Sequence, residues 1–396
     1  MTDTKGADRL DDLEDRLDRP ISPTYPLRDN EIVGVWRRRS VEALHRLAHK
    51  GVLDRKDAHG RPLHEHLFAI ADGPILAAFE QSPGRALLLG EVVRNVDAPG
   101  RITQGLKGTC AATCVEIHLA EREPAEYARL CAGLVRPEGR VEMRSGDVLL
   151  RDEDVLVHDE HEFRRSPMSR LFQVACMEYA YPELDYRNAE DGQFEGAKNT
   201  GTGLSFGAFE RLLNAITGQR WDTVSDGHAK LAALFARFGV DTKRVPDLRR
   251  DALQIIDRTT AAGETLFATL EVPRVRVPVR RAAAPSNGQS LGQAAHKIRV
   301  LGLDRPRGLV IYDDPMDPQV SWFEGVRTRV EDKYGRCTMA IEDFEKLVVE
   351  LSYRPDLWQV DGEDNPLSTR TPASTKVPAS TKAPASSPGP SQARRA

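Results

Sequence analysis

The chain has few cysteines, few aromatic residues and no long apolar run. Its 396 residues include five cysteines, at positions 110, 114, 131, 176 and 337, and 6% aromatic residues. An odd number of cysteines, without a CxxC pair or a Cys/His spacing, argues against a disulfide framework and against a zinc site. No apolar stretch approaches the roughly 18 residues that a membrane-spanning helix requires. We therefore expect free thiols and no membrane span.

The chain also lacks an excess of charge of either sign. It carries 56 Lys and Arg against 60 Asp and Glu, a formal net charge of −4. Proteins that bind nucleic acids or membrane surfaces need a basic excess, so the composition argues against both classes of partner. The first twenty residues are acidic and contain no apolar stretch of the kind found in a Sec signal. These features predict a cytoplasmic protein, while export by a route without a cleaved signal stays open.

Composition divides the chain into three regions. Residues 1–85 are charged, and their apolar residues recur at three and four positions, which predicts helices. Residues 86–363 mix helical segments with β-like runs and turn signals, as one globular domain does. From residue 364 the chain is rich in Pro, Ala, Ser and Thr, buries too little apolar surface to fold, and is expected to be disordered. Residues 1–85 fit three roles equally: an inhibitory propiece, a partner-docking segment or a covering layer.

The middle region begins mainly with helical patterns and ends with strand patterns. We expect a strand over 85–93 and a hairpin over 139–152. Helices are expected over 110–121, 124–134, 167–180, 205–217 and 247–263, and strands over 265–272, 296–304, 307–314 and 325–332. Helices followed by an antiparallel sheet are the order of the α+β class.

Cys110 has the setting of a nucleophile. It follows a turn that contains Gly105 and Gly108, and it opens a helical segment. The N-terminal end of a helix lowers the pKa of a thiol through the helix dipole and the free backbone N–H groups. Gln104, six residues before Cys110, is placed to join the backbone N–H of Cys110 in stabilising an oxyanion. A buried, inert cysteine at a helix start fits the same local pattern, and Cys114, one turn later, is expected in the core.

A histidine and two aspartates lie at the ends of two neighbouring β-like runs. The short turn over 304–308 predicts that these runs form a hairpin. In an antiparallel pair the first residue of one strand lies opposite the last residues of the other, which places His296 beside Asp313 or Asp314. A Cys–His pair whose histidine is oriented by a third polar group is the arrangement of an activated nucleophile.

These stretches resemble the motifs of the papain-like cysteine peptidase superfamily. The stretch QGLKGTCA, 104–111, is similar to the family's Q-G-x-C-G-S-C-W, and HKIRVLGL, 296–303, loosely follows its H-A-V-x-V-x-G-Y. Asp314 before a proline resembles the form found in bacteriocin-leader peptidases, whereas Asp313 is nearer to the spacing of the papain Asn. Ala111 replaces the family's aromatic residue and Lys297 its small residue, which points to a divergent bacterial branch.

The resemblance implies a two-lobe α+β fold, with the nucleophile helix in a helical lobe and the histidine on an antiparallel sheet. It implies a thiol hydrolase that cleaves protein or peptide substrates through an acyl-enzyme, with Cys110, His296, Asp314 or Asp313, and Gln104 as its catalytic residues. It requires no metal or organic cofactor. Acyl transfer to an amine, as in transglutaminases and deamidases, would use the same residues. A non-catalytic, peptidase-like binding module is a further alternative.

Overall fold

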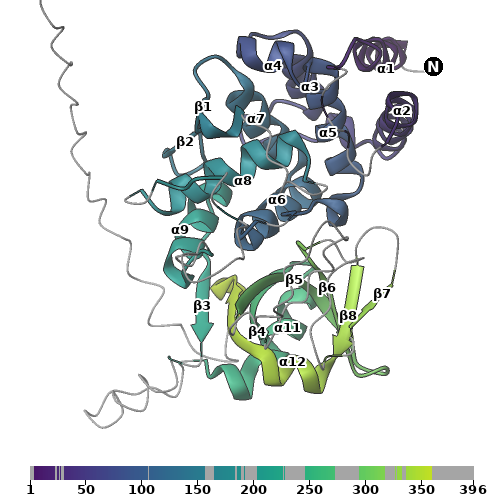
Figure 1. Cartoon of the computed structure of the whole chain (residues 1–396). Helices are drawn as coiled ribbons and strands as arrows, with labels where there is room; N and C mark the ends of the chain where they lie inside the picture. Colours follow the sequence, from purple (N-terminus) through teal and green to yellow (C-terminus); the bar gives the residue numbers. More distant parts are fainter. Residues whose placement is uncertain are drawn as a thin grey trace, which may run out of the picture. The chain divides into compact units, whose positions relative to one another are not determined.

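The computed structural model contains a group of helices and a region built on an antiparallel sheet (Figure 1). This mixture confirms the α+β class. Residues 1–358 form one compact unit, and the second unit, residues 359–396, lies outside the described residues together with the tail expected from residue 364. The structure describes residues 4–22, 25, 27, 31–105, 107–156, 165–182, 185–188, 191, 203–225, 227, 246–272, 294–316, 326, 328–331 and 336–358.

The helical region is formed by consecutive elements of the first part of the chain. Its elements are α1 (Thr4–Leu17), α2 (Val33–His49), η2 (Val52–Asp54), α3 (Leu63–Asp72), α4 (Ala77–Gln81), α5 (Arg85–Asp97), η3 (Pro99–Arg101), α6 (Cys110–Arg122), α7 (Pro124–Val135), the hairpin of β1 (Arg140–Glu142) and β2 (Val148–Leu150), η4 (Asp154–Leu156), α8 (Pro167–Ala180) and α9 (Phe206–Thr217). Ser166 and Ser205 cap α8 and α9, because their hydroxyls accept from backbone N–H groups in the first turns of these helices. None of the described helices is long and apolar enough to cross a membrane.

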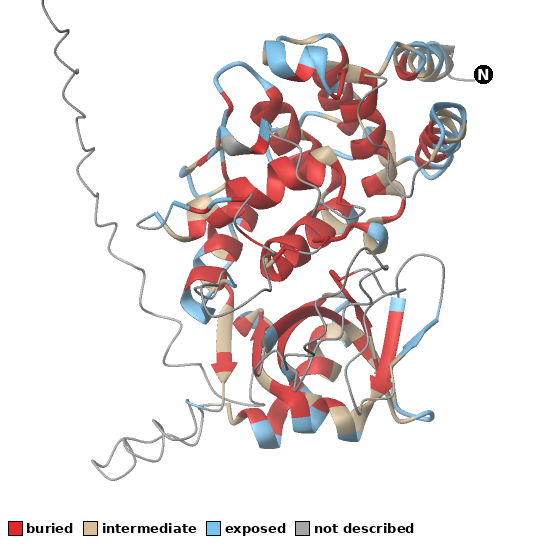
Figure 2. Ribbon diagram, viewed as in Figure 1, coloured by how far each residue is buried: buried red, intermediate tan, exposed pale blue. Residues whose placement is uncertain are grey.

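Helix α5 shows that the strand expected over 85–93 was wrong. Most of its side chains are buried, from Ala86 to Val96 (Figure 2). A continuous apolar run has no period that distinguishes a buried helix from a buried strand. Gly90 allows Trp36 of α2 to approach closely, since a Cβ at this position would lie 2.3 Å from the Trp36 ring. The indole N–H of Trp36 donates to Glu91 Oε1 at 2.9 Å.

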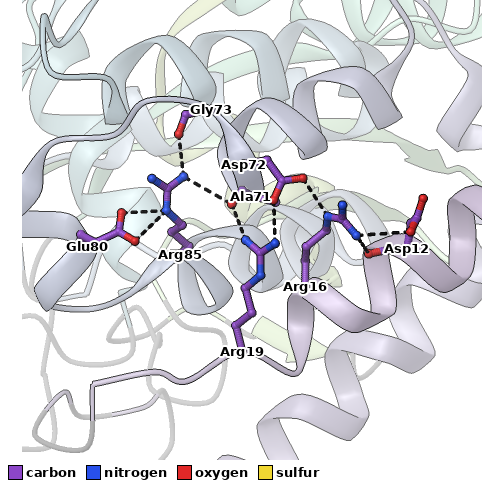
Figure 3. Close-up of polar contacts among 8 residues, drawn as sticks. All are labelled: Asp12, Arg16, Arg19, Ala71, Asp72, Gly73, Glu80 and Arg85. Atoms are coloured by element: carbon purple, nitrogen blue, oxygen red, sulfur yellow. Dashed lines mark hydrogen bonds and ion pairs between the residues drawn. The ribbon is translucent and has the colours of Figure 1, made fainter.

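The N-terminal helices belong to the helical core. Leu13, Leu17 and Leu44 are buried in one apolar cluster with residues of α5 to α8. Figure 3 shows how α1 and the residues that follow it are tied to the end of α3: Arg16 Nε and Arg19 Nη2 lie 2.8 and 2.7 Å from the two carboxylate oxygens of Asp72. Residues before and after position 85 therefore share one apolar core.

The second region is a seven-stranded antiparallel sheet with the order β3-β9-β4-β5-β6-β8-β7. Its strands are β3 (Asp222–Ser225), β4 (Leu266–Val272), β5 (Ala294–Asp304), β6 (Leu309–Asp313), β7 (Thr328–Val330), β8 (Arg336–Ala340) and β9 (Val348–Tyr353), with α11 (Leu248–Ala261), α12 (Ile341–Leu347) and η6 (Pro355–Leu357). Four of these strands were expected, and β5 and β6 form the predicted hairpin. Residues of α11 and α12 pack with the strands in a second core.

One face of α6 connects the helices to the sheet. Cys110, Cys114, His118 and Arg122 follow one another at intervals of one helical turn. The thiol of Cys114 donates to the carbonyl oxygen of Lys297 at 3.6 Å, and His118 Nδ1 lies 3.2 Å from the hydroxyl of Thr265. This contact positions the first residue of α6 at the beginning of β5, where His296 lies.

Candidate active site

The imidazole of His296 lies between a carboxylate and a thiol. Its Nε2 is 2.8 Å from Asp314 Oδ1, and the ring is near enough to the Cys110 thiol for each group to shift the pKa of the other. Because the carboxylate occupies Nε2, Nδ1 is the nitrogen left to face the sulfur. Cys110 is 8% exposed, His296 3% and Asp314 1%, so water screens these interactions little.

The charges of this group favour a thiolate and an imidazolium. Burial by itself raises the pKa of the Cys110 thiol, but the hydrogen bond and charge of His296 and the backbone N–H of Lys297 lower it below its ordinary value. Burial disfavours the imidazolium, yet Asp314 and Cys110 together raise the pKa of His296 to about 10. The two shifts have opposite directions, and both favour transfer of the thiol proton to His296.

The other cysteines on α6, α7 and α8 behave differently. Burial raises the pKa of Cys114, Cys131 and Cys176 well above the ordinary thiol value. These three thiols are fully buried, as expected of core residues. The lowered pKa of Cys110 has the direction that a thiolate nucleophile requires.

Asp314 is the aspartate that binds His296. Asp313, the last residue of β6, lies opposite Arg299 in the register, and its Oδ2 is 3.2 Å from Arg299 Nη1. Successive residues of a strand point to opposite faces, which is why the two carboxylates diverge. Asp314 Oδ1 also accepts the backbone N–H of Met316 at 2.9 Å. The alternative of Asp313 as the partner of His296 is thereby corrected.

Gln104 lies in the turn before Cys110 and is 4% exposed. Its backbone N–H donates to the carbonyl oxygen of Pro315 at 2.8 Å. Its side-chain Nε2 donates to the carbonyl oxygen of Lys107 at 2.6 Å. An amide nitrogen carries two hydrogens, and this bond uses one of them.

The turn before Cys110 is also held from the loop that follows α8, which the sequence did not indicate. The buried ammonium of Lys107 donates to the carbonyl oxygens of Asn188 and Asp191, at 2.6 Å each. The Asp191 carboxylate accepts the backbone N–H of Gly108 at 2.8 Å. No local pattern links residues so far apart in the chain, because their contact depends on how α8 and its loop fold back.

Lys297 stands where the family resemblance has a small residue, and it is buried. Its Nζ lies 2.9 and 3.0 Å from the two carboxylate oxygens of Glu350 on β9, and 4.2 Å from the ring centroid of Phe209. Glu350 also accepts from the hydroxyl of Ser352 at 3.0 Å. A buried cation that is paired in this way is compatible with the core. No local sequence pattern indicates that Glu350 is the partner of Lys297.

Two other polar groupings lie outside this arrangement. A cavity of about 630 Å³ lies at the opposite end of α6, where Glu121, Arg122 and Arg336 contribute to its lining, and neither Cys110 nor His296 does. The carboxylates of Asp152, Glu178 and Asp185 place oxygen atoms within 4.8 Å of one another, the kind of grouping that can hold a cation. None of the candidate catalytic residues belongs to either grouping.

The chain matches none of the protein-family models against which it was scanned, and no curated protein matches it. A functional assignment therefore depends on the geometry. That geometry brings together four of the five residues expected from the sequence: Cys110, His296, Asp314 and Gln104.

Proposed function

We propose that the chain is a cysteine peptidase of papain-like fold. One observation carries the proposal: the His296 imidazole is held between the Asp314 carboxylate and the Cys110 thiol, and the thiol is at the N-terminal end of α6. The order of the elements supports it further, since a helical region provides the nucleophile and an antiparallel sheet provides the histidine.

The proposed reaction starts from the thiolate and the imidazolium. The Cys110 sulfur attacks the carbonyl carbon of a peptide bond, and the electron pair of the C=O bond moves to the oxygen. The backbone N–H of Cys110 and the remaining amide hydrogen of Gln104 donate to this oxyanion. His296 gives its proton to the leaving amine as the C–N bond breaks, which leaves a thioester on Cys110.

Water then completes the cycle. His296, now neutral, accepts a proton from a water molecule, and the resulting hydroxide attacks the thioester carbon. The C–S bond breaks, the carboxylic acid product leaves, and the thiolate and imidazolium form again. Asp314 holds the ring orientation through Nε2 during both half-reactions.

The test is covalent labelling of the reduced, purified protein with a papain-type epoxide inhibitor, followed by peptide mapping. We expect one adduct, on Cys110, and none in His296→Ala, because the epoxide requires both the thiolate and the proton of the imidazolium. Cys114→Ser is the matched control and should keep the adduct. A folded protein that gains no adduct, or gains adducts on all five cysteines alike, would contradict the proposal.

A further inference from the structure

Gln173 on α8 holds both ends of the turn that precedes Cys110. Its Oε1 accepts the hydroxyl of Thr109, the residue before the nucleophile, at 2.9 Å. Its Nε2 donates to the carbonyl oxygen of Thr103, the residue before Gln104, at 3.2 Å. Gln173 and Thr109 are fully buried, and Thr103 is 4% exposed. One amide group therefore connects the start and the end of the segment that carries the oxyanion donor.

The chemistry of its neighbours determines how the amide of Gln173 is oriented. Its Nε2 faces the Thr103 carbonyl and, at 2.9 Å, a carboxylate oxygen of Glu116, both of which can only accept. Its Oε1 is thereby directed to the Thr109 hydroxyl. Thr109 is the N-cap residue of α6, yet its side chain makes no capping hydrogen bond. Because Gln173 binds the Thr109 hydroxyl, this hydroxyl does not accept from the N–H groups of the first helical turn.

Glu116 in turn fixes Gln173. This carboxylate lies within α6, is fully buried, and accepts from the hydroxyls of Tyr127 on α7 and Ser169 on α8, both at 2.8 Å. The amide of Gln173 is thus anchored to three helices of the core. A buried polar network in which every group is paired is rigid, since each lost bond leaves an unsatisfied group.

We propose that Gln173 is a positioning residue of the candidate active site. It keeps the Cys110 thiolate aligned with His296 and keeps the Gln104 amide beside the future oxyanion. This inference rests on the proposed function. Misplacement of a reacting group by about 1 Å costs on the order of 100-fold in rate. Loss of the hydrogen bonds from Gln173 to the two ends of this turn should therefore lower the reaction rate measurably.

The test compares four variants by the rate and pH dependence of epoxide labelling at Cys110 and by thermal unfolding. Thr109→Val removes the hydroxyl that Gln173 binds, and Thr109→Ser restores it. Gln173→Glu keeps the acceptor for Thr109 but loses both N–H donors. Thr217→Val is the matched control, because it removes a buried hydroxyl that accepts from Trp221 Nε1 at 3.1 Å and that contacts neither Glu116 nor the turn.

We expect Thr109→Val and Gln173→Glu to label Cys110 about 10- to 100-fold more slowly at pH 6, with a profile shifted toward that of an ordinary thiol. Thr109→Ser should recover most of the rate. Thr217→Val should unfold at a lower temperature but label at the wild-type rate. If Gln173→Glu does not fold, the comparison of Thr109→Val with Thr109→Ser tests the positioning role of Gln173.

Two results would overturn the inference. In the first, Thr109→Val labels at the wild-type rate. In the second, Thr217→Val slows labelling as much as Thr109→Val does, which would reveal a general loosening of the core. A different result would contradict the proposed function: wild-type Cys110 would itself label only in the pH range of an ordinary thiol. The inference about Gln173 would then be contradicted as well.

Discussion

The backbone N–H of Gln104 donates to the carbonyl oxygen of Pro315, the residue that follows Asp314. The proposed oxyanion donor and the carboxylate that binds His296 are therefore joined through the main chain. Because the bond involves backbone atoms, substitution of the Gln104 or Asp314 side chain leaves it in place. The two contributions can consequently be tested one at a time.

Asp314→Asn should shift the basic limb of epoxide labelling. Asp314 raises the pKa of His296 to about 10 against the effect of burial, so loss of its charge lowers that pKa while Asn can still accept from Nε2–H. An opposite charge typically contributes about 1–3 pKa units. Labelling in wild type should fall as His296 loses its proton near pH 10, and in the variant about 1–3 units lower. The measurement is the second-order rate of inactivation from pH 5 to pH 11.

Asp313→Asn is the control for this comparison. Asp313 pairs with the fully buried Arg299, whose other ion-pair partner is Glu121. We expect the variant to keep the wild-type basic limb and to lose stability, by up to about 3–5 kcal/mol in urea unfolding. An equal shift of the basic limb in both variants would show that the effect is not specific to Asp314.

Gln104→Ala should separate activation of the thiol from stabilisation of the oxyanion. Alkylation of Cys110 by iodoacetamide forms no oxyanion, and its rate should stay within about twofold of wild type. Cleavage of a peptide substrate should fall by about 10²–10³ in kcat, the usual loss for one oxyanion donor. Gln104→Glu, which keeps the size but loses the amide hydrogens, should be similarly slow. Equal losses in alkylation and cleavage would assign Gln104 a structural role instead.

The parts of the fold that local sequence specifies were predicted well. Ser166 and Ser205 begin helices, Gly218 ends one with a φ of 64°, and the hairpin over 139–152 forms with Gly146 in its turn at a φ of 89°. These features depend on a few neighbouring residues. The prediction for residues 85–93 was wrong for the converse reason: the segment is mostly apolar and shows no clear period, and its packing between other helices makes it a helix.

The candidate site was predictable only where residue type and chain order carry the information. Cys110 and His296 could be named, but the choice between Asp313 and Asp314 depends on a register that shifts between Val300 and Gly302 in β5. Gln173 could not be named, because its three bonds join α8 to α6 and to the turn before it, and no periodicity records such contacts.

The buried pair of Lys297 and Glu350 should be stabilising only as a pair. Lys297→Met leaves a buried carboxylate, and Glu350→Gln leaves a buried ammonium, so each should lower the free energy of unfolding by about 3–5 kcal/mol. The double variant should lose clearly less than the sum of the two. Urea unfolding of all four proteins measures this coupling, and strict additivity would show that the pair contributes no interaction energy.

His118 should make the protein sensitive to acid. Burial above all, with the nearby positive charges of Arg299 and Arg122, lowers its pKa to about 3 from an ordinary 6.5. Between these values the unfolded chain binds a proton that the folded chain does not. The contribution is therefore complete above pH 6.5 and is lost as the pH falls toward 3, by about 1.4 kcal/mol per pH unit.

His118→Phe removes this titration and retains an aromatic ring beside Trp221 and Phe267, which His118 contacts edge-on. Urea unfolding at pH 7, 6 and 5 should show a shallower decline in stability for the variant than for wild type. Identical slopes would mean that His118 is protonated in the folded protein.

Removal of residues 1–85 should unfold the helical region rather than raise the rate of Cys110 labelling. An inhibitory propiece can be removed without loss of the fold, but Trp36 donates to Glu91 across this boundary and packs against Gly90. The truncated chain would expose the apolar surface of α5 and should be insoluble or lack a cooperative transition. Gly90→Ala is the milder test: its new methyl group meets the Trp36 ring, which should cost about 1–3 kcal/mol with labelling of Cys110 unchanged. A truncated chain that is monomeric, unfolds cooperatively and labels faster than the full chain would instead establish residues 1–85 as an inhibitory segment.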